Sequence, residues 1–304
     1  MNNTLKLLIK TLLTAGLMIV LPACEKTIFV ELEDTYPRVV MNGLLTPNYG
    51  LWLNVSASVP CSEPSSTSYK PVTGAIAQYY QGDDLIASII SSNQSGDYYA
   101  TDFKPLPGQE YRITVASYGM PEASAVVTVP FPVSITGFDT AVVINHIESI
   151  YGSYDETQFF VDLSIPDPEY IQNYYMLGLF YLENGQYLPL EAYTEDINMN
   201  IYIQDGLGIL AWNDQNFDGQ AIDFTINFHL VKEAGFETDF RIILYSIEEA
   251  YFKYLKTYSQ NFTILNEDAL LFEPVQVSSN IAGGYGIIAA YSSHTVSFGY
   301  TFRN

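Results

Sequence analysis

The sequence is poor in cysteine, in histidine and in basic residues. Its 304 residues include two Cys, three His and 12 Lys or Arg, against 34 Asp or Glu, which gives a formal net charge of −22. Such an acidic chain has little with which to neutralise phosphates, so duplex nucleic acid is excluded as a partner and direct docking on anionic lipid headgroups is disfavoured. The acidity suits a soluble body outside the cell, or a surface that collects cations or a basic partner.

The sequence also lacks the familiar catalytic patterns. The histidines His146, His229 and His294 do not have the spacing of a metal-binding pair, and no Gly-x-Ser-x-Gly segment or neighbouring Cys–His pair occurs. Any two of the abundant carboxylates could form a glycosidase pair, and the sequence does not choose among them. We therefore expect that the protein is not an enzyme, and a hydrolase with an unrecognised carboxylate pair stays as an alternative.

The first 24 residues have the pattern of a bacterial lipoprotein signal peptide. Lys6 and Lys10 precede an apolar run that is too short to span a bilayer, and the run ends in Leu-Pro-Ala before Cys24. We expect cleavage after Ala23 and attachment of a diacylglycerol to Cys24, because acyl chains give durable membrane anchoring. The alternative is an ordinary cleaved signal peptide in which Cys24 is incidental.

Lipidation of Cys24 leaves Cys61 as the only other thiol, so we expect no internal disulfide. Stability must then come from core burial, for which the length and the 48% apolar content are sufficient. Cys61 lies in a polar stretch, and the sequence does not tell whether it is reactive or incidental.

Residues 37–130 have the pattern of an antiparallel β-sandwich. Apolar residues alternate with polar ones, most clearly from Leu51 to Val59, and Gly-containing turns separate the runs. The sequence predicts seven strands: Arg38–Leu45, Leu51–Val59, Ala75–Tyr80, Leu85–Ile90, Asp97–Thr101, Tyr111–Ser117 and Ala123–Val129. Their regular spacing indicates an immunoglobulin- or transthyretin-like sandwich.

The segment Pro130-Phe131-Pro132 interrupts this pattern, so we expect a domain boundary there. The second half is also rich in strands, with one helix predicted near 247–260, where Ser246 and Glu249 form a capping box and Tyr251, Leu255 and Tyr258 follow on one face. The expected organisation is a signal peptide (1–23), a tether (24–36), the sandwich (37–130) and a larger β-rich domain with one packed helix (131–304).

Two loops could bind ligands or could simply be turns. Asp214, Asn216 and Asp218 open with the Asp-x-Asn-x-Asp-Gly spacing of a calcium loop, but Thr225 stands where an EF-hand needs a Glu. A plain turn between strands favours the same residues. Around 280–286, Asn280, Gly283, Gly284 and Gly286 could form an anion-binding nest or a tight structural loop. For residues 280–286 the structural loop is the expectation. No cofactor is expected, and calcium at residues 214–218 stays as an alternative to a plain turn.

Several short motifs together resemble one family. They are Cys24-Glu25-Lys26, Ile165-Pro166-Asp167-Pro168, Asn173-Tyr174-Tyr175, Phe217-Asp218-Gly219, the Tyr-rich 246–258 helix, Phe272-Glu273-Pro274-Val275 and Ser279-Asn280-Ile281-Ala282-Gly283-Gly284-Tyr285-Gly286-Ile287. This set resembles a Bacteroidota lipoprotein family, the domain of unknown function four-two-four-nine. Its members are commonly encoded beside a TonB-dependent outer-membrane receptor, and no catalytic residue is carried over.

The resemblance implies a lipid-anchored accessory protein of the outer membrane, exposed on the cell surface, that binds a TonB-dependent receptor, a nutrient or both. A structural or adhesive surface module is the alternative. Asp139-Thr140-Ala141 also resembles the O-glycosylation acceptor used in this phylum, which would make Thr140 a modification site, although a plain strand residue explains it too. The sequence does not name the ligand, the receptor, the membrane leaflet or the oligomeric state.

Overall fold

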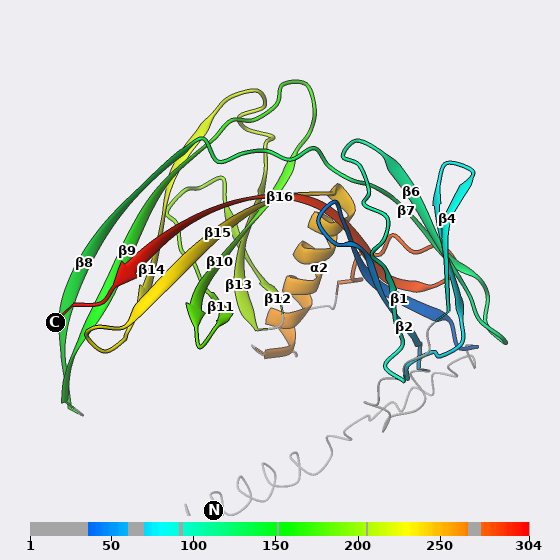
Figure 1. Ribbon diagram of the computed structural model, residues 1–304, viewed down its shortest axis with the longest axis horizontal. Helices are drawn as coiled ribbons and strands as arrows, with labels where there is room; N and C mark the ends of the chain where they lie inside the picture. The colour runs from blue at the N-terminus through cyan, green and yellow to red at the C-terminus, as the bar shows by residue number, and fades with distance from the viewer. Residues whose placement is uncertain are drawn as a thin grey trace, which may run out of the picture. The chain divides into compact units, whose positions relative to one another are not determined.

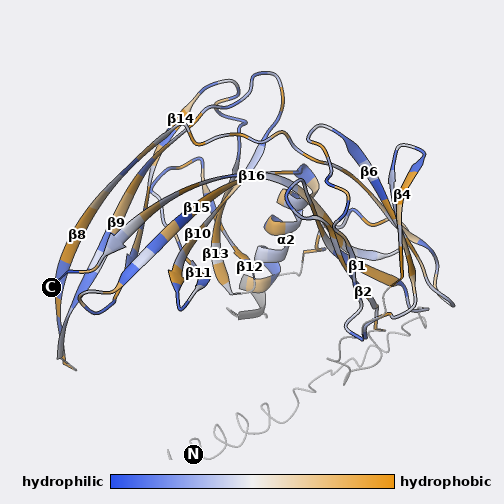
Figure 2. Cartoon of the chain, viewed as in Figure 1, coloured by the Kyte–Doolittle hydropathy of each residue, from blue (hydrophilic) through white to orange (hydrophobic). Residues whose placement is uncertain are grey.

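The computed structural model describes residues 36–59, 70–90, 94–150, 152–204, 206–266 and 275–303 (Figure 1). Cys24, Cys61 and the predicted signal peptide lie outside this part of the chain. Within it, no helix is both long enough and apolar enough to cross a membrane. Alternating apolar and polar residues are visible along the strands in Figure 2.

The seven strands predicted in the first half are confirmed, and they form the two layers of a sandwich. One layer has β1 (Val39–Thr46), β2 (Gly50–Ala57) and β5 (Asp97–Ala100); the other has β4 (Asp84–Ile90), β3 (Ile76–Gln81), β6 (Glu110–Ala116) and β7 (Ala123–Thr128). Their inward residues, such as Met41, Leu53, Tyr79 and Tyr111, are fully buried in one core. The alternation of apolar and polar residues determines which face of each strand is buried in the core.

The second half contains another pair of packed sheets. A three-stranded sheet consists of β14 (Ile222–Leu230), β9 (Gly152–Ile165) and β8 (Gly137–Ser149), in that order. It packs on a sheet of β12 (Asn200–Gln204), β13 (Leu207–Asn213), β10 (Tyr174–Glu183), β15 (Glu237–Ile247) and β16 (Tyr285–Thr301), with β11 (Gln186–Leu190) beside β10. Aromatic rings fill the space between the layers, and Phe159 stacks on Phe228 at 4.8 Å.

The predicted helix is present as α2 (Glu249–Asn266), on the opposite face of the larger sheet. Tyr251, Phe252 and Leu255 are buried there against strand residues such as Ala211. The predicted start at 247 and the capping box are wrong. Ser246 and Ile247 still belong to β15, and the Ser246 hydroxyl accepts a hydrogen bond from the Val133 N–H.

The fold is therefore all-β with one packed helix in the part of the chain that is described. A single long strand links its two halves. Residues 285–290 of β16 pair in parallel with β1, and residues 291–301 pair antiparallel with β15. The boundary expected near Pro130 stays a prediction, and hydrogen-bonded sheet crosses from one side of it to the other through β16.

Candidate functional site

Three aspartates converge where two loops of the second half meet. Asp167 follows β9, and Asp214 and Asp218 follow β13; one carboxylate oxygen from each lies within 4.8 Å of the others. Asp167 and Asp214 are buried, and Asp218 is exposed. This is the one group of metal-ligand type found among the described residues.

Each of the three carboxylates already accepts a hydrogen bond from a neighbouring loop or from β10. The Asp167 oxygens accept from the Tyr175 hydroxyl at 2.5 Å and from the Gly219 N–H at 2.9 Å. Asp214 Oδ2 accepts from the Asn173 N–H at 2.6 Å and from its side-chain amide at 3.2 Å. Asp218 Oδ1 accepts from the Tyr170 N–H at 3.0 Å. The carboxylates thus hold residues 167–175 against residues 214–219.

Burial and the neighbouring negative charges raise the cost of ionising the most buried member, Asp214. Burial raises the pKa of Asp214 above its ordinary value, and the nearby Asp167 and Asp218 carboxylates raise it further, whereas the donors of Asn173 lower it. A bound cation would oppose this repulsion, and oxygen ligands of this type suit calcium.

The arrangement agrees only in part with the predicted calcium loop. Asp214 and Asp218 come together, but Asn216 donates its side-chain amide to Asn198 Oδ1 at 3.0 Å instead of joining them. The third carboxylate is Asp167, which no sequence motif assigned to a site. It lies 47 residues before Asp214, so only the pairing of the strands brings the two together.

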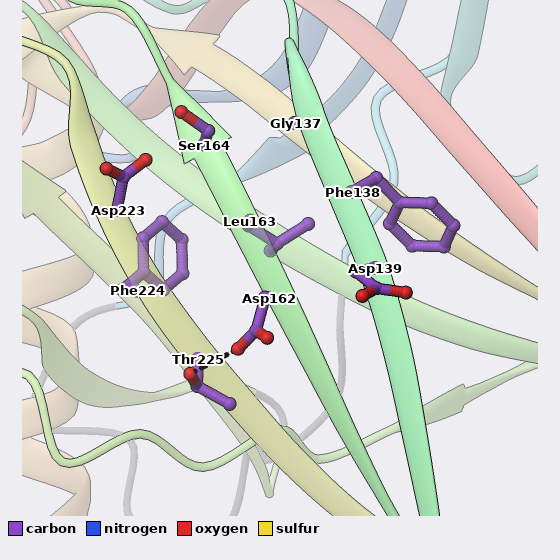
Figure 3. A pocket seen from close by; sticks show the side chains of 9 residues that line it. All are labelled: Gly137, Phe138, Asp139, Asp162, Leu163, Ser164, Asp223, Phe224 and Thr225. Carbon is purple, nitrogen blue, oxygen red and sulfur yellow. Dashed lines mark hydrogen bonds between the residues drawn. The ribbon is translucent and has the colours of Figure 1, made fainter.

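A shallow acidic pocket of about 360 Å³ lies on the three-stranded sheet (Figure 3). Asp139 on β8 is directly opposite Asp162 on β9, and Asp162 is directly opposite Thr225 on β14. The Thr225 hydroxyl donates to Asp162 Oδ1 at 2.6 Å, the dashed line in Figure 3. Carboxylates directly opposite each other on neighbouring strands repel one another, so this face favours a positively charged partner.

The β8–β9 hairpin exposes many large apolar side chains. Those that are exposed are Phe138, Val142, Val143, Ile144, Ile150 and Tyr154. Figure 2 shows β8 as largely hydrophobic. Phe138, Val142 and Ile144 lie on one face of β8, and exposed apolar side chains that gather in this way on a protein surface are typical of an interaction site.

A second, mostly apolar cleft of about 520 Å³ lies beside the start of α2. Exposed Phe131 and Ile171 line it together with Tyr174, and Glu248 and Glu249 supply carboxylates. Glu248 Oε1 accepts a hydrogen bond from the Thr128 N–H, and Oε2 is buried without a partner among the described residues. Burial raises the pKa of Glu248 to about 7, with a further contribution from Glu110.

The glycine loop packs tightly against the first sandwich. A Cβ at Gly284 would lie 2.3 Å from the Val39 carbonyl oxygen, and one at Gly286 would lie 2.1 Å from that of Met41. Positive φ occurs at Gly283 and Gly286 but not at Asn280 or Gly284. The Asn280 side chain instead pairs with the backbone N–H and C=O of Ile288. These contacts hold the loop in place and leave no room for an anion at Gly284.

The other predicted residues do not form a site of their own. Thr140 is exposed on β8, and its N–H donates to Asp139 Oδ1 at 2.8 Å. Of the histidines, His146 is 2.7 Å from Asp155, and His294 Nδ1 accepts from the Ile135 N–H. His229 stacks on Tyr193. The three do not form a catalytic group.

The fold and these sites define an all-β protein with two packed layers in each half and an acidic, partly apolar surface. The model of the family described as "Domain of unknown function (DUF4249)" matches residues 25–297, and the chain belongs to that family. No curated protein matches the chain.

Proposed function

We propose that the protein is a non-enzymatic, lipid-anchored accessory protein of the outer membrane that binds a TonB-dependent receptor at the cell surface. The lipoprotein pattern at Cys24 and the family resemblance support this proposal. The family match begins at residue 25, directly after the expected lipidated cysteine.

The observation that carries the binding role is the exposed apolar surface of the β8–β9 hairpin. Val142 and Ile144 expose large side chains on one face of β8, and Val143 does so on the other face, which also carries Asp139. Apolar side chains surrounded by polar ones are typical of protein interfaces. A receptor surface with apolar and basic groups would match this hairpin.

Affinity purification from detergent-solubilised outer membrane tests the proposal. The tagged wild type should bring down a large TonB-dependent receptor, and Val143→Lys with Ile150→Lys should reduce the yield with an unchanged melting temperature. Leu85→Lys with Ile90→Lys is the matched control, because Leu85 and Ile90 are also exposed large apolar residues but lie on β4 of the first sandwich. A wild type that brings down no receptor would contradict the proposed function.

The anchor and the location have separate tests. Cys24→Ser should move the protein out of the membrane fraction, and it should stay out after a salt wash. Proteinase K added to intact cells should digest the wild type, whereas digestion only after lysis would place it in the periplasm.

A second candidate function is capture of a small ligand in the cleft beside α2. Its walls are largely apolar, and its only charged lining residues are Glu248 and Glu249, so it would suit an apolar molecule with one amine. Octylamine should then raise the melting temperature of the wild type more than octanoate does, and Phe131→Ala should remove the difference. Equal effects of the two ligands would exclude this candidate.

A further inference from the structure

Strand β8 has an open edge along its length. Within the described part of the chain it pairs only with β9. The N–H of Thr140 donates to the side chain of Asp139, so this N–H points away from β9. Backbone groups alternate between the two edges of a strand, so the N–H and C=O groups of Val142 and Ile144 point to the open edge as well.

The core is incomplete along the same edge. On the inner face of the sheet, Val142 is directly opposite Phe159, and Ile144 is directly opposite Thr157. Phe159 is fully buried, whereas Val142 is 36% exposed and Ile144 is 41% exposed. The β8 side chains therefore have neighbours on the β9 side and water on the other, which leaves apolar surface that another strand could bury.

The opposing sheet ends on this side too. The Phe138 ring on β8 contacts Phe298 on β16 at 5.8 Å. Over residues 291–301, β16 pairs with β15 alone, because its pairing with β1 stops at Ala290. Among the described residues, both layers of the second sandwich thus end in a strand with a free edge, and the two strands are in contact (Figure 1).

The negative charge of the three-stranded sheet favours a basic partner segment over a second copy of this chain at the edge of β8. Its three strands carry the carboxylates Asp139, Glu148, Asp155, Glu156, Asp162 and Asp223 and no Lys or Arg. Edge-to-edge pairing of two copies of this chain would bring these carboxylates together, and like charges across neighbouring strands are destabilising. A basic segment would instead be attracted by these carboxylates.

We propose that the open edge of β8 accepts an extended segment of a partner protein in which apolar residues alternate with Lys or Arg. The segment would add a strand, hydrogen-bonded to Val142 and Ile144, with apolar side chains over the inner face. Its basic side chains would lie on the outer face, toward Asp139 and Asp162. This inference rests on the proposed receptor-binding function and names the chemistry of the segment bound.

Amide hydrogen exchange with a defined probe tests the proposal. The full chain carrying Cys24→Ser is mixed with a peptide of alternating Val and Lys, or with a matched peptide of alternating Val and Glu. The Lys peptide should slow exchange at Val142 and Ile144 at least about tenfold, the factor that 1.4 kcal/mol represents, with little change at Val143, which already faces β9. Absent protection, or equal protection by the Glu peptide, would overturn the proposal.

Two variants test separately how the open backbone edge and the acidic side chains contribute to peptide binding. Val142→Pro removes one N–H at the open edge, where proline is tolerated, so it should abolish peptide binding and keep the melting temperature. Asp139→Asn with Asp162→Asn should weaken binding of the Lys peptide and leave the edge intact. If Val142→Pro retains peptide binding, β8 is not the docking strand.

The receptor purification distinguishes the two proposals. A wild type that binds the Lys peptide but brings down no receptor would refute the proposed function and leave the edge inference standing. A Val142→Pro variant that still brings down the receptor as well as wild type does would refute the edge inference and leave the proposed function standing.

Discussion

Glu248 Oε1 accepts a hydrogen bond from the Thr128 N–H at 2.9 Å, between residues 120 positions apart in the sequence. Thr128 ends β7 of the first sandwich, and Glu248 precedes α2 of the second half. A buried carboxylate therefore connects the two halves, and its ionisation state should affect the stability of the whole chain.

The free energy of unfolding should fall as the pH rises from about 4.5 to about 7, because of Glu248. Burial raises its pKa from 4.5 to about 7, so over this range the folded state keeps a proton that the unfolded chain loses. The stabilisation is fully present below the pKa of Glu248 in the unfolded chain, and it is lost as the pH rises through the pKa of Glu248 in the folded state. The total loss of stability is at most about 3 kcal/mol. Urea unfolding of the wild type and of Glu248→Gln, at several pH values, measures this difference.

The Gln variant should be the more stable protein at pH 8, by up to the same amount, because it keeps an acceptor for Thr128 and cannot ionise. Glu249→Gln is the control. The neighbouring Lys253 lowers the pKa of Glu249, so its contribution is lost only as pH falls below the usual Glu range. If the stability of Glu248→Gln still falls as in wild type when the pH rises from 4.5 to 7, Glu248 is not the group that causes the pH dependence.

Gly284→Ala should destabilise the fold by about 2 kcal/mol or more, which is the range for forcing atoms into a packed site. The cause is the Val39 carbonyl oxygen, 2.3 Å from the added Cβ. Gly299→Ala is the matched control, because its φ is not positive and its Cβ would meet nothing closer than 3.2 Å. Equal melting temperatures of the two variants would contradict the tight packing of the loop.

The inward face of α2 should behave as core. Leu255 is fully buried, so Leu255→Ala should cost about 2–5 kcal/mol. Tyr254 is half-buried, and its ring stacks between Tyr251 at 6.2 Å and Tyr258 at 5.6 Å, so Tyr254→Ala should cost less. Thermal unfolding measures both, with the exposed Lys256→Ala as control. A Tyr254→Ala variant that keeps its melting temperature and loses receptor binding would indicate a binding platform instead.

Local patterns were sufficient to predict most strands, but not β13, whose two faces are both covered. In β13, Leu210 and Trp212 enter the core between the sheets while Ala211 packs under α2. The apolar run Leu210-Ala211-Trp212 therefore shows no alternation, and this strand was not predicted. In β16, Ser292, Ser293 and His294 look like a break between two strands, yet their backbones pair with β15 without interruption.

The candidate sites depend on contacts between distant residues, which the sequence pattern does not contain. The pairing of β1 with β16 joins residues about 245 positions apart. Asp167 joins Asp214 only because the ends of β9 and β13 meet. The glycine loop was predicted as structural from its composition, but the reason for Gly284, a close approach to β1, required the fold.

The three aspartates can act as a hydrogen-bonded loop contact or as a calcium site, and two variants distinguish these roles. Asp214 is buried, and its carboxylate satisfies two donors of Asn173. Asp214→Ala leaves these donors without an acceptor, so it should cost about 1–3 kcal/mol in the presence of EGTA.

Asp218→Asn keeps an acceptor for the Tyr170 N–H and removes one of the charges that raise the pKa of Asp214. Without calcium it should therefore leave the stability unchanged or slightly increased. We expect the wild-type melting temperature to be the same in EGTA and in millimolar calcium, because the loop donors already occupy these carboxylates. A calcium-dependent rise in the wild type that Asp218→Asn abolishes would instead establish a calcium site, with Asp167 as the ligand that the loop motif does not supply.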